Sequence, residues 1–240
     1  MVVRAVAAAA AVALTLGLGT GPARAECRLA LALAFDVSRS VSARDYRIQR
    51  DGLLAALADP VVVSAFLVPG EPVAFALFEW SHSVQQTMVV DWVLVRSPAD
   101  LAALRGLIVS HERSGTAGTT ALGAALRFGR ELMDRAPACT DRVIDISGDG
   151  QNNSGVDPAL VYAAGFDDIR VNGLAIRSYE RDVATYYREQ VIRGPGAFVE
   201  VAETFADFPR AIRRKLIREL TERIIGQGVT RDPEIARHAG

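Results

Sequence analysis

The sequence predicts an α/β domain whose mostly parallel sheet is covered by helices on both faces. Apolar runs of strand length alternate along the chain with segments that carry apolar residues at helical spacing. The first run, 29–35, is almost continuously apolar, which is typical of a strand buried on both faces. The chain has 240 residues, of which 50% are hydrophobic, so it can bury one substantial core. We therefore expect a three-layer, doubly wound, Rossmann-like domain.

The segment after the first strand should contain two helices, a hairpin and a third helix. An apolar stripe predicts a helix over 44–58, and Asp59-Pro60 starts a short second one. Two apolar strands, 73–80 and 84–90, are joined by only three residues, a connection that permits only an antiparallel pair. Ser97-Pro98 supplies an N-cap and a first-turn proline for the third helix. The hairpin should therefore add one antiparallel edge strand to the sheet.

From residue 115 onward, strands and helices alternate regularly. The loop 115–120 leads into a helix over 122–132, whose N-terminus presents unpaired N–H groups. The later elements are a strand over 142–147, a helix beginning at Asp157-Pro158, a strand over 170–176, a helix over 182–191, a strand over 198–201 and a final helix capped by Asp207.

Two charged features stand out within these elements. Asp145 interrupts an apolar strand, so it should face the crevice or pair with an arginine. A basic run in the last helix alternates with the apolar stripe, which indicates a solvated face, and a docking surface for an acidic partner is the alternative. The run consists of Arg210, Arg213, Arg214, Lys215 and Arg218.

The first 25 residues resemble a secretion signal. Arg4 precedes the apolar run 5–18, and Ala23-Arg24-Ala25 is a small-x-small cleavage site. Cleavage after Ala25 would leave a domain over 26–225 and a polar tail over 226–240. The run is shorter than the roughly 20 residues that span a bilayer, and no later segment is long and apolar enough. We expect an exported protein, periplasmic or secreted, with no membrane span after cleavage; an uncleaved anchor is the alternative.

Both cysteines lie just before predicted strands. Cys27 precedes 29–35 and Cys139 precedes 142–147, so both thiols fall at the same edge if these strands are parallel neighbours. An exported protein can keep a disulfide. We predict a Cys27–Cys139 bond, with two unlinked thiols as the alternative.

Three loops should meet at the opposite edge of the sheet, where parallel strands end and ligand sites lie. They are 36–40, 118–120 and 148–150, and together they offer two carboxylates and several hydroxyls but no histidine, thiol or lysine. An all-oxygen donor set suits a hard divalent cation such as Mg²⁺.

These residues resemble the metal-ion-dependent adhesion site of von Willebrand factor A-type domains. Asp36, Ser38 and Ser40 match the family's D-x-S-x-S motif, and Asp149 stands where the family has an aspartate after a later strand. The stretch 118–126 looks like the family's G-G-T-x-x-G-x-A-L and selects Thr120 over Thr119 as the equivalent threonine.

The resemblance covers about 30–220 and is closest to the bacterial exported group known as domain-of-unknown-function family 1194. The shared stretches include Ile144-Asp145-Ile146-Ser147-Gly148-Asp149-Gly150, Asn172-Gly173-Leu174-Ala175-Ile176 and Gly194-Pro195-Gly196-Ala197-Phe198.

The resemblance implies metal-dependent binding and no enzyme activity. Ser38, Ser40 and Thr120 would coordinate Mg²⁺ or Mn²⁺ through their hydroxyls, and Asp36 and Asp149 would hold it directly or through water. An open coordination position would accept a carboxylate from a protein or peptide partner. Arg39 would either assist such an acidic ligand or be an exposed bystander.

Two other function classes remain as alternatives: a metal-dependent, phosphatase-like hydrolase, and a structural exported domain with a non-functional ion site. Aspartate-nucleophile phosphatases have a second aspartate where Ser38 stands and a lysine near the phosphate, whereas the only lysine here is Lys215. A serine triad is not indicated, because there is no G-x-S-x-G elbow and His82, His111 and His238 have no evident partners. Lys and Arg total 27 against 28 Asp and Glu, so nothing points to nucleic acid.

Overall fold

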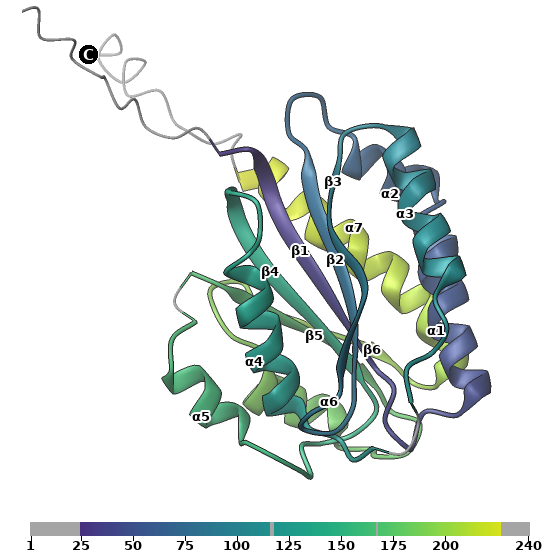
Figure 1. Ribbon diagram of the computed structural model, residues 1–240, viewed down its shortest axis with the longest axis vertical. Helices are drawn as coiled ribbons and strands as arrows, with labels where there is room; N and C mark the ends of the chain where they lie inside the picture. Colours follow the sequence, from purple (N-terminus) through teal and green to yellow (C-terminus); the bar gives the residue numbers. More distant parts are fainter. Residues whose placement is uncertain (1–24, 116–117, 167, 227–240) are drawn as a thin grey trace, which may run out of the picture.

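The computed structural model describes residues 25–115, 118–166 and 168–226, and it contains one six-stranded sheet in the order β3-β2-β1-β4-β5-β6 (Figure 1). The strands are β1 (Cys27–Asp36), β2 (Val73–Trp80), β3 (Gln86–Val95), β4 (Cys139–Gly148), β5 (Arg170–Ile176) and β6 (Val199–Ala202). Only the β2–β3 pair is antiparallel; the other neighbouring pairs run parallel. The predicted fold class and the antiparallel edge strand are therefore confirmed.

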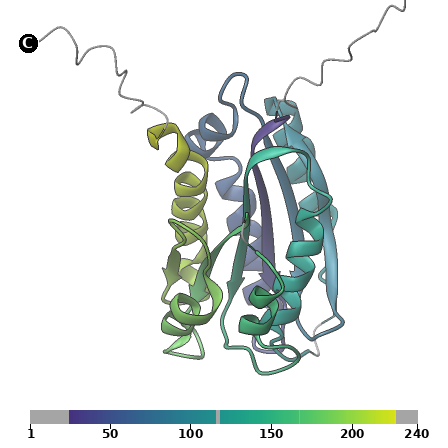
Figure 2. The ribbon, with the colours of Figure 1, turned by 90° about the vertical axis from the view of Figure 1, so that its left-hand side faces the viewer.

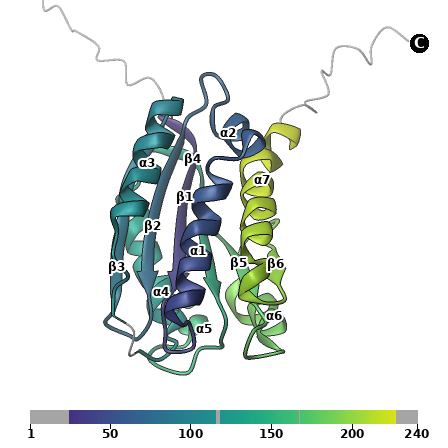
Figure 3. The same ribbon diagram turned by 90° about the vertical axis from the view of Figure 1, so that its right-hand side faces the viewer.

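Helices cover both faces of the sheet. They are α1 (Ala43–Ala56), α2 (Pro60–Phe66), α3 (Pro98–Ser110), α4 (Leu122–Met133), α5 (Pro158–Ala163), α6 (Val183–Tyr186) with a π-helical turn (Tyr187–Val191), and α7 (Phe208–Gly226) after a 3₁₀ turn (Phe205–Asp207). Figure 2 shows the molecule from the side of α4 and α5. In Figure 3, α1, α3 and α7 lie in front of the strands. This is the expected three-layer arrangement.

Strand β1 lies at the centre of the sheet and contributes to both halves of the core. Its large side chains, Leu29, Leu31 and Leu33, belong to the cluster packed under α1, α3 and α7. The intervening alanines, such as Ala32, belong to the cluster packed under α4 and α5. Because successive strand side chains point to opposite faces, burial of both sets explains why this run is continuously apolar.

Several element boundaries differ from the sequence-based expectation. β3 begins at Gln86 and not at residue 84, because Ser81 N donates to Gln85 O (3.1 Å) and the turn leaves Val84 83% exposed at its tip. The predicted helix over 182–191 is α helical only in α6 and then widens into the π turn.

The final helix α7 begins directly after Asp207, the residue predicted to cap it. A 3₁₀ turn precedes α7, and its N-cap is Thr204, whose side chain forms a capping box with that of Asp207: Thr204 N donates to Asp207 Oδ2 at 3.2 Å. Asp207 therefore lies three residues inside the first turn, where a carboxylate reaches back to the cap backbone.

The structure contains the Cys27–Cys139 disulfide. The two residues are register partners on β1 and β4, with Cα atoms 4.5 Å apart, and they are separated by 112 positions in sequence. β4 begins at Cys139 itself, three residues earlier than predicted.

Replacing both cysteines by serine should lower the free energy of unfolding by about 2–4 kcal/mol, because the bond closes a long loop in the unfolded chain. Urea unfolding of the oxidised and reduced wild type provides the control, and reduction should have an effect of the same size. Equal midpoints for the oxidised protein and the double variant would contradict this prediction.

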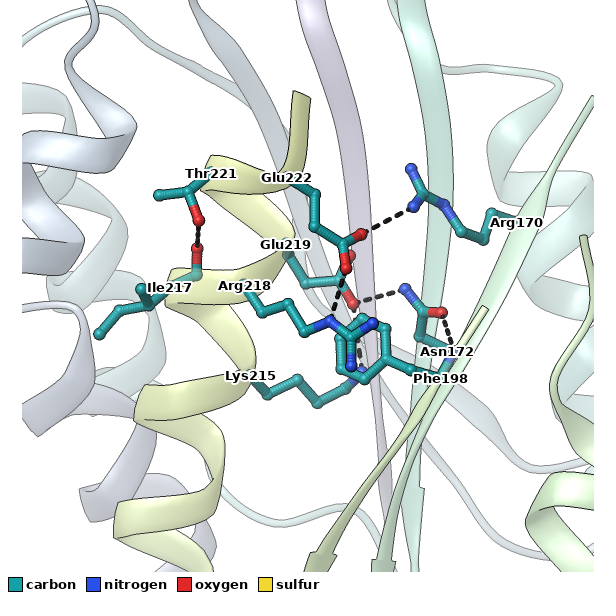
Figure 4. Close-up of polar contacts among 9 residues, drawn as sticks. All are labelled: Arg170, Asn172, Phe198, Lys215, Ile217, Arg218, Glu219, Thr221 and Glu222. Carbon is teal, nitrogen blue, oxygen red and sulfur yellow. Dashed lines mark hydrogen bonds and ion pairs between the residues drawn. The ribbon is translucent and has the colours of Figure 1, made fainter. Parts of the chain in front are cut away.

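A buried charged cluster lies between α7 and the sheet (Figure 4). Lys215, on α7, is 0% exposed, and its Nζ lies 3.1 Å from Asp145 Oδ1 and 3.1 Å from Glu219 Oε1. Asn172 Nδ2, from β5, donates to the same Glu219 oxygen at 2.7 Å. The ring of Phe198 faces Lys215 Nζ, with 4.2 Å between this atom and the ring centroid.

This cluster corrects two expectations. Asp145 neither faces the crevice nor pairs with an arginine; it pairs with the lysine of α7. Lys215 is not part of the solvated basic face, although Arg210 and Arg214 of the same run are exposed and pair with Asp207 and Glu200 at the surface.

The predicted signal segment 1–25 and tail 226–240 lie outside the described residues, apart from Ala25 and Gly226. Within the described part of the chain, no helix has both the length and the apolar composition needed to cross a bilayer.

Candidate metal site

The five predicted ligands come from three loops that meet at the carboxyl edge of the sheet. Asp36 is the last residue of β1, and Asp149 directly follows β4, the parallel neighbour of β1. The loop that carries Thr120 precedes α4. It is fixed to the first loop, 36–40 after β1, because Arg39 N donates to Gly118 O at 3.0 Å. This edge is opposite the disulfide, as the sequence predicted.

Short contacts bring the predicted ligands together. Ser40 Oγ donates to Asp149 Oδ1 at 2.7 Å, and the hydroxyls of Ser38 and Ser40 are 3.3 Å apart. Ser38 N donates to Asp36 Oδ1 at 2.7 Å. Thr120 Oγ1 lies 3.5 Å from the position that a Cβ on Gly150 would occupy, so it faces the loop that carries Asp149.

The two carboxylates have an electrostatic environment that disfavours their charge. Both are 0% exposed, and each keeps one oxygen, Oδ2, without a hydrogen-bond partner. Burial, followed by the negative charge of Asp149, raises the pKa of Asp36 to about 7. Burial raises the pKa of Asp149 to about 6, although the hydrogen bond from Ser40 lowers it. A bound cation would compensate for both effects.

A cleft of about 200 Å³ opens over the site. Arg39 lines it from the first loop, and Tyr179 and Glu180 line it from the loop after β5. Glu180 Oε2 accepts a hydrogen bond of 3.1 Å from Gln151 N, which ties that loop to the Asp149 loop. The cleft therefore has a cationic and an anionic side chain around the metal ligands.

Sequence reasoning missed Arg113, whose guanidinium holds the loop after β1 in place through backbone carbonyls. Its Nη2 donates to the carbonyl oxygens of Val37 (3.0 Å), Ser38 (3.4 Å) and Val41 (2.7 Å), and its guanidinium stacks over Tyr46. An arginine in a loop between helices carries no local signal for this role, because its three acceptors lie more than 70 positions away in sequence.

Asn152 and Asn153 were also missed as supporting residues. Asn153 Oδ1 accepts from Thr120 N, and Asn153 N donates to Thr120 O, both at 2.9 Å. Asn152 Oδ1 accepts from Gly123 N at 3.3 Å. Two adjacent asparagines, three and four residues after Asp149, are the sequence signal that could have revealed these contacts.

His111 has an acidic partner that the sequence did not reveal. Its Nε2 lies 3.3 Å from Oε2 of Glu79, a buried residue near the end of β2. Ser114 Oγ donates to the same oxygen at 2.6 Å. The serine thus contacts the carboxylate and not the imidazole, which differs from the order of a serine triad.

The residues present fit a hard divalent cation. The donor set consists of oxygens only, two carboxylates and three hydroxyls, and two carboxylate oxygens are unpartnered. Among the described residues, there is no group of three or more His, Cys, Asp or Glu side chains that could hold a metal by themselves. Hydroxyl and carboxylate oxygens are the ligands that Mg²⁺ and Mn²⁺ prefer.

A family model described as "Protein of unknown function (DUF1194)" matches residues 26–224 of this chain. The chain belongs to this family. No curated protein matches the DUF1194 chain.

Solved structures similar to the DUF1194 chain share its fold. One is proximal thread matrix protein 1 from the mussel byssus with a zinc-occupied MIDAS motif (TM-score 0.57, 17% identity, 80% of this chain and 46% of that one). Another is a von Willebrand factor type A protein from Catenulispora acidiphila (TM-score 0.53, 15% identity, 81% of this chain and 43% of that one). A third is the pilus adhesin SpaC from Lactobacillus rhamnosus GG (TM-score 0.59, 14% identity, 82% of this chain and 30% of that one). The DUF1194 chain spans less than half the length of each. It has the von Willebrand factor A fold.

Proposed function

We propose that this chain is an exported adhesion or interaction domain that binds a divalent cation and uses it to engage an acidic group of a protein or peptide partner. The observation that carries the proposal is the convergence of Asp36, Asp149 and three hydroxyls below an open cleft. Support also comes from relatives in fold that are a byssus matrix protein and a pilus adhesin, one of them with zinc in its MIDAS motif.

The roles of the side chains are part of this proposal. Ser38, Ser40 and Thr120 would hold the cation through neutral hydroxyls, and Asp36 and Asp149 would hold it directly or through water. When bound, Mg²⁺ or Mn²⁺ supplies a Lewis-acidic centre that attracts a carboxylate ligand. Neutral hydroxyl ligands leave more of the positive charge for the partner.

Export and lack of catalysis are parts of the same proposal. The disulfide supports an oxidising compartment such as the periplasm, and the signal-like segment 1–25 supports secretion. A phosphatase-like hydrolase would instead turn over generic phosphate esters with Mg²⁺ and lose that turnover in Asp36→Ala. A structural domain with a non-functional site would show no affinity for metal.

Asp149→Asn should weaken Mn²⁺ binding at least tenfold, because it removes one of the two charges that attract the cation. Calorimetric titration of the purified wild type, with saturable binding at one site, gives the reference. Asp91→Asn is the matched control, since Asp91 is an exposed carboxylate on β3 and its removal should leave the affinity unchanged. Equal affinities of the two variants would refute the assignment of Asp149, and absence of binding in the wild type would refute the metal site.

A further inference from the structure

Three buried side chains, each with an unpartnered polar atom, meet at Gly148, and one of them is the candidate metal ligand Asp36. A Cβ at Gly148 would lie 2.6 Å from the Tyr187 hydroxyl oxygen, 2.9 Å from Asp36 Oδ2 and 3.2 Å from Cζ2 of Trp80. All three side chains are 0% exposed. The Tyr187 hydroxyl, Asp36 Oδ2 and Trp80 Nε1 are each without a hydrogen-bond partner.

The fold makes room for Tyr187 to reach this point. The residue opens the π-helical turn after α6, and such turns are frequent at functional sites. Its ring passes over Gly173 of β5, where a Cβ would lie 2.7 Å from the ring atom Cδ1. Gly173 and Gly148 lie on the neighbouring strands β5 and β4, so a side chain at either position would push the ring away from Asp36.

The chemistry of the three groups is complementary. Asp36 Oδ1 already accepts from Ser38 N, whereas Oδ2 has no donor. A tyrosine hydroxyl and an indole N–H are both donors, and an ionised carboxylate is only an acceptor. Buried polar groups are almost always paired, which makes three unpaired ones around a single point an unusual arrangement.

We propose that Tyr187 is a positioning residue of the metal site, whose hydroxyl donates to Asp36 Oδ2 in the metal-bound protein, with Trp80 as a second donor. Tyr187 fixes the orientation of the carboxylate and thereby the position of the D-x-S-x-S loop oxygens. This role rests on the proposed metal binding. Hydrogen bonds of this kind to metal ligands commonly change metal affinity 10–100-fold.

Tyr187→Phe, which removes only the hydroxyl, should weaken Mn²⁺ binding about tenfold or more by calorimetry. The matched control is Tyr162→Phe. Tyr162 is also a buried tyrosine, and it donates its hydroxyl to Val191 O at the far end of the π-helical turn that begins with Tyr187. The control should lose stability but keep its metal affinity, so a general loss of packing is distinguished from loss of positioning.

A second measurement uses the unmutated protein. The chain has five tyrosines, so ¹³Cζ-tyrosine labelling gives five NMR signals, and Tyr187 can be assigned by elimination from Phe variants of the other four. Addition of Mg²⁺ should shift the Tyr187 signal, because its hydroxyl becomes a donor to Asp36, and leave Tyr162 unchanged.

The outcomes separate this inference from the proposed function. If wild-type protein binds no metal, both fail. If the wild type binds metal but Tyr187→Phe retains full affinity, or the Tyr187 signal does not respond to Mg²⁺, only the positioning role is overturned.

Discussion

Lys215→Met should lower the free energy of unfolding by about 3–5 kcal/mol. The lysine is 0% exposed and is the shared cationic partner of Asp145 and Glu219, each 3.1 Å from its Nζ. Its removal leaves two carboxylates facing each other in the core under α7, and a buried charge without its partner is among the most destabilising changes known. Chemical unfolding monitored by circular dichroism measures the effect.

Arg214→Met is the matched control, because Arg214 is the preceding residue on the same helix but its side chain is 54% exposed and pairs with Glu200 at the surface. Its loss should cost under about 1 kcal/mol. The triple change of Lys215→Met with Asp145→Asn and Glu219→Gln removes the uncompensated charges and should recover most of the stability. A cost for Lys215→Met no larger than for Arg214→Met would disprove the importance of the cluster.

The stability of the protein should fall as the pH rises from about 4 to about 7, and Asp145→Asn should reduce this dependence. Burial raises the pKa of Asp145 from its ordinary value of 3.8 to about 7, opposed by the positive charge of Lys215 and assisted by the negative charge of Glu219. The folded protein therefore holds this proton more tightly than the unfolded chain does. Its contribution is complete below pH 4 and is lost through pH 7, amounting to several kcal/mol.

Urea unfolding of wild type and Asp145→Asn at intervals from pH 4 to pH 8 tests this. The difference between the two proteins is the informative quantity, because Asp36 and Asp149 titrate in the same interval in both. The side chain of the Asp145→Asn variant has no proton to lose, and Lys215 keeps Glu219 as a partner. The free energy of unfolding of the variant should therefore increase relative to that of the wild type as the pH rises. Parallel pH profiles would show that Asp145 titrates normally.

Local patterns in the sequence determined the strands, the disulfide and the composition of the candidate site. The run 29–35 is apolar at every position because β1 is packed on both faces, and that requirement is visible without knowing its neighbours. The loops that follow β1 and β4 had to meet once those strands were parallel neighbours. The same register brings Cys27 opposite Cys139 at the other end.

The polar partners inside the fold were decided only by the tertiary structure. The sequence shows Lys215 within a basic run, yet it lies three residues after Ile212 and four before Glu219, on the buried side of α7. Helical spacing indicates which face is buried but not that Asp145, on β4, supplies the opposite charge there. A pairing between residues 70 positions apart depends on how the helix packs on the sheet.

The surroundings of the metal ligands depend on packing in the same way. Arg113 below the first loop and Tyr187 behind Asp36 have no local signature, because their partners lie on strands and loops far away in sequence. The sequence therefore identified which oxygens gather at the edge of the sheet, since strand ends place them there. The three-dimensional packing determined which side chains orient those oxygens, because contacts between segments distant in sequence form only when the helices pack on the sheet.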